Sequence, residues 1–453
     1  MSRHISIHVG QCGIQVGLSM WRRLMREHGI RPDGTAEDLD NSVNECRECF
    51  FDVADDGRYL PRAFFVDLEP GLFKRLTANY SIFDNDCFFH GIEGDMAGAG
   101  NKWATGYKKG NEVWRALEKQ LRWVYTYFQG DADAFYVTHS AIGGTGSGLG
   151  SYVIEQLAQT WPSVPIITHT LFPSKESDVV TGYINAAFTT ARLIDHAAMT
   201  VVYDNAALAL ATDEDGAGAD GDSTKGFALQ NDLIARVICD MTSGMRFASG
   251  GASNTKELLA QTVVDPLRKF IVPHEAPIGG DEAGIITNAQ DVIQQLFEGQ
   301  TALADIDSTT ATHLSSTIIL RGDMSMLYEE EHAAATYIRA VQASIHSPVR
   351  FAHRPGRPFQ PPLIELCHQS PHDGKAFERT GLMLSNTTAV VSNSRVFRTG
   401  VIDLLLDKIK AGPKSSIPFF EEDTDISVTR ETLEEARDRV RVELTETYLE
   451  EGQ

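Results

Sequence analysis

The sequence predicts an α/β protein: a doubly wound parallel sheet, then a long core helix, a second α+β domain and C-terminal helices. Three observations support this prediction. Short β-rich runs alternate with helical stretches in the first half, a glycine-rich turn lies between a strand and a helix, and shorter elements follow residue 246. Such alternation is typical of a parallel sheet with helices on both faces.

The strands of the parallel sheet are expected where short apolar, β-rich runs occur. These runs are Ile5 to Val9, Ala63 to Leu68, Ala134 to Thr138, Pro165 to Leu171 and Thr200 to Tyr203. Between the second and third runs, apolar residues from Val113 to Phe128 recur at spacings of three and four, which predicts a helix. We interpret its apolar stripe as core packing.

The second half contains a predicted core helix from about Phe227 to Met245, whose apolar residues step by four. An acidic, glycine-rich stretch over residues 212–223 precedes it and predicts a solvated loop. Strands are expected near residues 316–323 and 381–388. A final helix from Thr429 to Tyr448 has a possible capping box at Thr432 and Glu435. Its charged side chains predict a solvated face, or alternatively a surface for a partner.

Composition restricts the class of protein. The 453 residues are 42% hydrophobic and 23% charged, with 40 Lys plus Arg against 62 Asp plus Glu, for a net charge of -22. This charge argues against a nucleic-acid partner. We find no apolar run of about eighteen residues and no signal region, so we expect a cytosolic protein without a membrane span. The 6 cysteines are too few and scattered for a disulfide framework.

The glycine-rich turn at residues 139–148 reads His-Ser-Ala-Ile-Gly-Gly-Thr-Gly-Ser-Gly and precedes a helix expected from about Leu149. Residues without Cβ atoms allow backbone N–H groups to crowd around an anion, and the helix start adds its positive dipole end. The hydroxyls of Thr145 and Ser147 can donate as well. We therefore interpret the turn as a phosphate cradle, in preference to a flexible loop.

Two further segments have chemistry that suits the same site. Gly10 and Gly13 follow a strand and open a helix, where their backbone can approach a diphosphate. Asp67 and Glu69 come just after another strand, at the carboxyl edge where open α/β sheets bind ligands. Two carboxylates separated by one residue can hold Mg²⁺ at this edge. The alternative is a pair of solvated turn carboxylates.

These motifs together resemble the tubulin superfamily. The resemblance rests on residues 8–17, the Val-Asp-Leu-Glu-Pro block at residues 66–70, the glycine signature with Ile142 in place of its first glycine, residues 320–323 and residues 384–388. It extends over nearly the whole chain. It implies GTP or GDP with Mg²⁺ as cofactors, and it divides the chain into a GTPase domain (residues 1–205), a core helix with an intermediate domain (206–384) and a C-terminal helical region (385–453).

The resemblance also assigns roles to individual residues. It implies phosphate contacts near Gly10, Gln11, Asn101, Ser140, Gly143, Gly144, Thr145 and Gly146, a guanine site formed by Asn205, Phe227 and Asn231 beside Cys12 and Gln15, and a ribose contact at Asp178. Glu69 and Asp67 would hold the metal, with Glu69 nearest. Phe227 stands where the family usually has Tyr, and a second ribose-loop carboxylate is missing.

Hydrolysis in this family takes place between stacked subunits, and the resemblance places Glu257 where the catalytic acid acts on the next subunit's nucleotide. A carboxylate can orient and deprotonate a water molecule. The alternative is an exposed acid near a helix start, where the dipole favours it.

The resemblance implies partners and a role as well. Expected partners are other tubulin subunits, stacked head to tail, and microtubule-associated or centriolar proteins. Some segments look more like delta-type or another minor tubulin than alpha or beta, which favours a structural role at centrioles or basal bodies in the cytoskeleton. One alternative is an alpha/beta-like subunit that polymerises and hydrolyses GTP. Another, from a different class, is a dinucleotide-dependent enzyme on a Rossmann-like sheet, although no catalytic group suited to a nicotinamide is evident.

Overall fold

The computed structural model describes residues 3–36, 47–71, 73, 80–91, 98–127, 132–174, 180–212, 227–247, 254–278, 289–297, 301–306, 312–322, 336, 338–339, 350–352, 363–367, 379–392 and 430–449. Its strands are β1 (His4–Val9), β2 (Phe51–Val53), β3 (Tyr59–Pro61), β4 (Ala63–Val66), β5 (Phe88–Phe89), β6 (Ala134–Ser140), β7 (Ile166–Phe172), β8 (Met199–Asp204), β9 (Phe270–Ala276), β10 (Thr312–Gly322), β11 (Arg350–Phe351), β12 (Leu363–Cys367) and β13 (Arg379–Thr387). Its longer helices are α1 (Gly10–Glu27), α4 (Trp103–Tyr127), α5 (Gly150–Thr160), α6 (Val180–His196), α7 (Asn205–Thr212), α9 (Ala228–Met241), α11 (Thr255–Thr262), α12 (Ala289–Phe297) and α16 (Arg430–Arg439). Shorter helical segments are α10 (Ser243–Arg246), α14 (Ala389–Ser392), α17 (Thr447–Leu449) and the turns η1 (Arg47–Cys49), η2 (Asn85–Cys87), η3 (Thr145–Leu149) and η6 (Val440–Glu446).

A parallel sheet forms the centre of the first half, in the order β5-β4-β1-β6-β7-β8, with all neighbours parallel. Every residue of β1, β6, β7 and β8 is buried. Strands of this kind must be covered on both faces. Because β1 lies inside the sheet and the chain continues to both of its sides, loops that follow β1, β4 and β6 meet at one edge.

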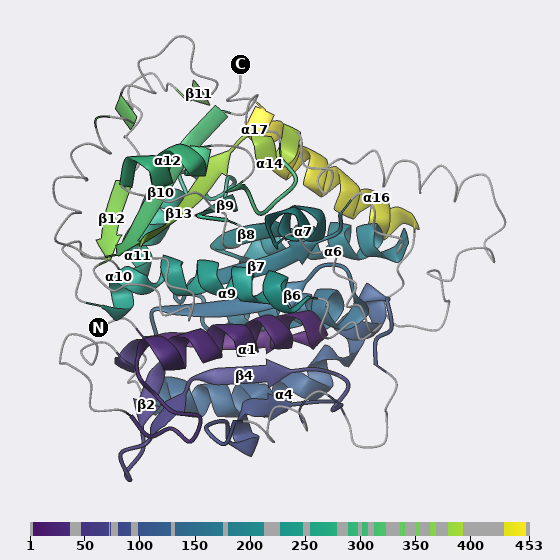
Figure 1. Cartoon of the computed structure of the whole chain (residues 1–453). Helices are drawn as coiled ribbons and strands as arrows, with labels where there is room; N and C mark the ends of the chain where they lie inside the picture. Colours follow the sequence, from purple (N-terminus) through teal and green to yellow (C-terminus); the bar gives the residue numbers. More distant parts are fainter. Residues whose placement is uncertain are drawn as a thin grey trace.

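Helices cover the two faces of this sheet and produce two separate apolar cores (Figure 1). On one face, Trp21 of α1 and Ile234 of α9 pack in the same core as Phe65 and Tyr136 of the sheet. On the other face, α4, α5 and α6 pack against side chains such as Ile7. The predicted doubly wound α/β fold is therefore confirmed, and the apolar stripe of α4 is buried from Val113 to Val124.

The second half continues the same sheet with mixed strand directions. β9 pairs in parallel with β8, and β13 pairs antiparallel with both β9 and β10. β10 is parallel to β11 and β12. Helix α12 packs on this region through Val292, Ile293 and Leu296, which form a third core. The second half is thus α+β, as predicted, and its strands join the first half within one 11-stranded sheet.

Helix boundaries differ from the sequence expectation in two places. The predicted core helix ends at Met241, and α10 follows from Ser243. At this break, the hydroxyl of Thr242 donates to the carbonyl oxygen of Ile238. The predicted capping box is wrong: α16 begins at Arg430, so Thr432 lies inside the helix.

The acidic stretch over residues 213–223 lies outside the described residues. Within the part of the chain that is described, no helix has the length and apolar character needed to cross a bilayer.

A buried ion cluster links the end of α1 to the second half of the chain. Glu27 contacts Arg246 of α10 at 2.6 Å and Arg321 of β10 at 3.0 Å, and Arg321 also contacts Asp240 of α9 at 2.5 Å. These side chains are at most 2% exposed. Burial alone raises the pKa of Glu27, but the adjacent guanidinium groups outweigh it and hold the pKa well below its usual range. The cluster therefore depends on both signs of charge being present.

Removing one cation should strongly destabilise the fold. In Arg321→Met, the carboxylate of Asp240 loses its contact at 2.5 Å and that of Glu27 loses one of its cations. We expect the free energy of unfolding, measured by denaturant titration, to fall by about 3–5 kcal/mol. Arg58→Met is the matched control, because Arg58 and Asp56 are 49% and 53% exposed; its loss should be about 0–1 kcal/mol. Similar small losses in both variants would contradict the prediction.

Candidate functional site

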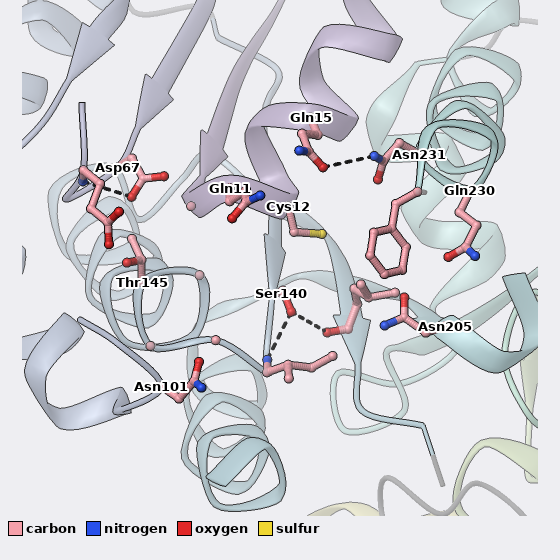
Figure 2. A pocket seen from close by; sticks show the side chains of 18 of the residues that line it. Gln11, Cys12, Gln15, Asp67, Asn101, Ser140, Thr145, Asn205, Gln230 and Asn231 are labelled. Atoms are coloured by element: carbon pink, nitrogen blue, oxygen red, sulfur yellow. Dashed lines mark hydrogen bonds between the residues drawn. The ribbon is translucent and has the colours of Figure 1, made fainter. Parts of the chain in front are cut away.

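A cavity of about 690 Å³ opens at the carboxyl ends of the parallel strands, between α1, α7, α9 and the loop after β6 (Figure 2). It is lined by Gly10, Gln11, Cys12, Gln15, Asp67, Glu69, Gly71, Gly100, Asn101, Ser140, Ile142, Gly143, Gly144, Thr145, Gly146, Leu171, Asn205, Leu208, Phe227, Gln230, Asn231 and Ile234. The volume is typical of a small-molecule site. The sequence reasoning singled out most of these residues, and the fold brings them together.

The loop after β6 turns directly into a helix. The backbone is helical from Gly144, through the π-helical turn η3, so the helix begins earlier than the predicted Leu149. The first N–H groups of a helix lack partners within it and favour an anion. Glycines 143, 144 and 146 and Thr145 all line the cavity. The expectation for Ser147 is wrong, because its side chain is buried and its hydroxyl donates to the carbonyl oxygen of Gly143.

Three loops are held together at this end of the cavity. Gly10 has a φ of 72°, and a Cβ there would lie 2.9 Å from the nitrogen of Gly146. The N–H of Gly144 donates to the carbonyl oxygen of Gly100 at 2.9 Å, which ties the loop of Asn101 to the loop after β6. That loop contains the phosphate cradle predicted from the sequence at residues 139–148 and is called the phosphate loop below. A side chain at Gly10 would separate the loops after β1 and β6, so glycine is required where they touch.

Asn185 of α6 holds two of these loops, that of Asn101 and that after β6, by hydrogen bonds to their backbones. Its Nδ2 donates to the carbonyl oxygens of Asn101 at 3.1 Å and Ile142 at 2.7 Å. Its Oδ1 accepts from the backbone N–H of Trp103 at 3.0 Å. The side chain is fully buried. Asn185 therefore positions both loops without lining the cavity, a role that the sequence did not indicate.

His139 holds the phosphate loop from the sheet side. Its two ring nitrogens lie 3.0 Å from the carbonyl oxygen of Gly146 and 3.0 Å from the hydroxyl of Thr170. Burial lowers the pKa of His139 to about 4. The imidazole is consequently neutral near pH 7, and it contributes geometry to the loop and no charge.

Asp67 brings a carboxylate to the end of the cavity that also holds Thr145 and Asn101 (Figure 2). Glu69 lines the same cavity, and its N–H donates to the Oδ1 of Asp67 at 3.2 Å. Burial raises the pKa of Asp67 to about 6. Among the described residues that line the cavity there is no Lys or Arg. An anionic ligand at this end would therefore require a cation, and two carboxylates are a donor set that suits Mg²⁺.

The protein alone offers few ligands to such an ion. In the described part of the chain, no group of three or more His, Cys, Asp or Glu side chains is arranged to bind a metal. Mg²⁺ usually keeps several waters and binds through one or two carboxylates plus substrate phosphates. Glu69 and Asp67 fit that pattern, with the remaining ligands supplied by the phosphates and water.

The opposite end of the cavity is amide-rich and uncharged (Figure 2). Asn205 opens α7, where Asp204 accepts from the N–H of Ala206 at 2.7 Å and fixes the turn. The Nδ2 of Asn231 donates to the Oε1 of Gln15 at 3.3 Å. Carboxamides both donate and accept, as a purine edge requires.

Phe227 and Cys12 supply the less polar groups at this end. Phe227 lines the cavity at the start of α9 and can stack on a planar ring. Burial raises the pKa of the Cys12 thiol to about 12. Cys12 therefore acts here as a small apolar neighbour, without thiolate chemistry.

Of the expected site residues, one lies outside the described part of the chain and another lies away from this cavity. Asp178 lies outside the described residues. Glu257 lies on α11, which follows the far end of α9. The 14 residues of α9 span roughly 20 Å at the usual helical rise, so Glu257 is remote from the cavity of its own chain.

Several lining residues were missed by the sequence reasoning, and Gln230 is the most polar of them. Residues 227, 230, 231 and 234 all line the cavity from α9. Their spacing is that of one helix face. That periodicity was the signal that could have revealed Gln230 and Ile234 beside the two residues already identified.

The sheet, the glycine-rich loop at a helix start and the two carboxylates define a nucleotide-binding α/β protein. Comparison with known proteins agrees: the Tubulin/FtsZ family GTPase domain matches residues 3–213, and the tubulin C-terminal domain matches residues 266–398. The chain is 31% identical over 404 residues to the tubulin gamma chain of Eremothecium gossypii, covering 86% of this chain and 81% of that one. It is 30% identical over 414 residues to the tubulin gamma chain of Candida glabrata, covering 86% and 82%. The chain belongs to the tubulin family, as a divergent GTP-binding member.

Gly143 offers a test of where phosphate binds. A Cβ at Gly143 would meet nothing within 4 Å, whereas one at Gly144 would lie 2.5 Å from the carbonyl oxygen of Gly100. Gly143→Ala should therefore leave the free energy of unfolding within about 0.5 kcal/mol. We expect it to weaken GTP binding, measured by calorimetry, about tenfold or more, because the methyl group enters the space of the phosphates.

The control is Gly91→Ala, since Gly91 has ordinary contacts and does not line the cavity. Gly91→Ala should change neither the free energy of unfolding nor the affinity for GTP. Unchanged GTP affinity in Gly143→Ala would show that the phosphates bind elsewhere.

Proposed function

We propose that this cavity binds GTP or GDP with Mg²⁺. The phosphates contact Gly10, Gln11, Asn101, Ser140, Gly143, Gly144, Thr145 and Gly146; the guanine and ribose contact Cys12, Gln15, Asp178, Asn205, Phe227 and Asn231; and Glu69 with Asp67 holds the metal. The observation that carries this proposal is the pairing of a helix-start glycine loop with carboxylates at one end of the cavity, where the described lining residues include no Lys or Arg. That combination suits a metal-bound polyphosphate.

We assign the chain a structural role in the cytoskeleton, as a cytoplasmic subunit that stacks head to tail on other tubulin subunits. Microtubule-associated or centriolar proteins would be its further partners. The relatives are both named gamma chains, whereas the sequence motifs favoured a delta-like or another minor class. Both point away from alpha and beta subunits. The proposal of a specialised assembly, such as a centriole or basal body, rests on the sequence motifs.

We also propose a functional division of the chain. Residues 1–205 form the GTPase domain, residues 206–384 the core helix and intermediate domain, and residues 385–453 the C-terminal helical region. Support comes from the separate matches of residues 3–213 and 266–398.

An alternative role is assembly-dependent GTP hydrolysis, and the location of Glu257 favours it. The side chain of Asn254 caps α11 by accepting from the N–H of Glu257 at 3.0 Å, which fixes the start of this helix. Because Glu257 is remote from its own cavity, its carboxylate could reach a nucleotide only in a neighbouring subunit. There it would orient and deprotonate the attacking water. A nicotinamide-dependent enzyme has less support, because the matching domain is a GTPase domain.

Bound nucleotide is the first test of this proposal. Protein purified in buffer with Mg²⁺ and then denatured should release close to one guanine nucleotide per chain, identified by chromatography. Purification with a chelator should lower this occupancy, because the phosphates would lose the cation that offsets Asp67 and Glu69. Absence of guanine nucleotide from both preparations would contradict the proposal.

Glu257→Gln tests the hydrolytic role. Under conditions in which the chain assembles, we expect GTP turnover to fall at least about 100-fold, since general base catalysis contributes about 10²–10⁴-fold. Binding of GTP by the isolated chain should not change. Glu118→Gln, the same substitution on α4, is the control and should hydrolyse normally. Equal turnover in both variants would exclude Glu257 as the catalytic base.

A further inference from the structure

Gln230 occupies an unusual position in the cavity wall. It lies on α9, one helical turn from Phe227 and beside Asn231, and all three line the cavity. Leu208 of α7 and Ile234 of α9 line the same cavity and are buried apolar side chains. A carboxamide at this site therefore has apolar neighbours within a packed wall.

The Oε1 atom of Gln230 is buried and, among the described residues, unsatisfied. The residue is 2% exposed, and its Oε1 has no hydrogen-bond partner among the described residues. Figure 2 shows its carboxamide at the end of the cavity that holds Asn205 and Asn231. An unsatisfied buried amide costs free energy of the order of a lost hydrogen bond, about 1–3 kcal/mol. Such a group is expected where a ligand completes the hydrogen bonding.

The neighbouring carboxamide of Asn231 differs from that of Gln230 because it already has a hydrogen-bond partner. The Nδ2 of Asn231 already donates to the Oε1 of Gln15. The acceptor on Gln230 has no such partner in the described part of the chain, so a ligand that supplies a donor satisfies it without breaking a bond seen there. A hydroxyl or amine of the ligand could do this in principle, but the end of the cavity with Phe227 suits a flat ring.

We infer that Gln230 reads the purine edge and selects guanine over adenine, an inference that rests on the proposed binding of GTP. Guanine presents N–H donors at its 1-position and its 2-amino group. Adenine has an unprotonated nitrogen and a C–H at these positions. A buried acceptor discriminates between the two, because adenine leaves it unsatisfied. Gln230 is therefore a specificity-determining residue beside Asn205 and Asn231.

The test compares GTP and ATP affinity in variants of the full chain, by calorimetry after exchange of bound nucleotide. Gln230→Met keeps the length of the side chain and removes the acceptor. GTP affinity should fall about 3- to 10-fold while ATP affinity changes less than about 2-fold, the effect of one hydrogen bond. Gln230→Glu keeps an acceptor and should retain the preference for GTP.

Stability separates this role from a structural one. Without nucleotide, Gln230→Met should be as stable as the wild type or more so, because an unsatisfied polar group is replaced by an apolar one of similar length. A marked loss of stability would show that the carboxamide supports the packing of α7 and α9, and would overturn the inference. Gln156→Met on α5, whose Nε2 bonds Gln159, is the matched control and should alter neither affinity.

The outcomes also separate this inference from the proposed function. If the wild type binds no guanine nucleotide, both are wrong. If it binds GTP and Gln230→Met shows the same ratio of GTP to ATP affinity, the proposed function remains and the role of Gln230 is rejected.

Discussion

The close approach of the loops after β1 and β6 is the constraint on which the candidate site depends. These strands pair in parallel from His4 with Ala134 to His8 with Thr138, so both chains leave the sheet at the same edge. The contact of Gly10 with Gly146 leaves no room for a Cβ. Asn185 and His139 then hold the phosphate loop from the α6 side and from the sheet side. Backbone amides at this edge are consequently fixed in place by the fold before any ligand binds.

A second constraint connects this site to the rest of the chain. Helix α9 begins with Phe227 as its N-cap, at the cavity, and Asp240, near its other end, belongs to the buried ion cluster with Glu27, Arg246 and Arg321. The cluster joins α1 to α9, α10 and β10. Because a buried charge is stable only with its partners in position, the cluster fixes the helix whose first turns form the wall of the cavity.

Much of the candidate site followed from local sequence. Glycines between a strand and a helix, and acids just after a strand, have a direct chemical meaning, which is why Gly143, Thr145, Asp67 and Glu69 could be identified from the chain alone. The helix of residues 103–127 was also readable from its apolar period. Helix ends were less predictable: the core helix ends at Met241 instead of Met245, and nothing in its apolar spacing marks the break.

The sequence by itself determined the fold class, the family and the chemistry of each loop, since these depend on residue type and short spacing. Only the tertiary structure decided which distant loops touch, that Ser147 supports its own loop, that Asn185 joins this loop to the loop of Asn101, and that Gln230 is left with an unsatisfied acceptor among the described residues. The physical reason is that burial and hydrogen-bond partners arise from contacts between segments far apart in the chain. The sequence does not distinguish Gln230 from an exposed glutamine on a helix, because its burial depends on how α9 packs in the folded chain.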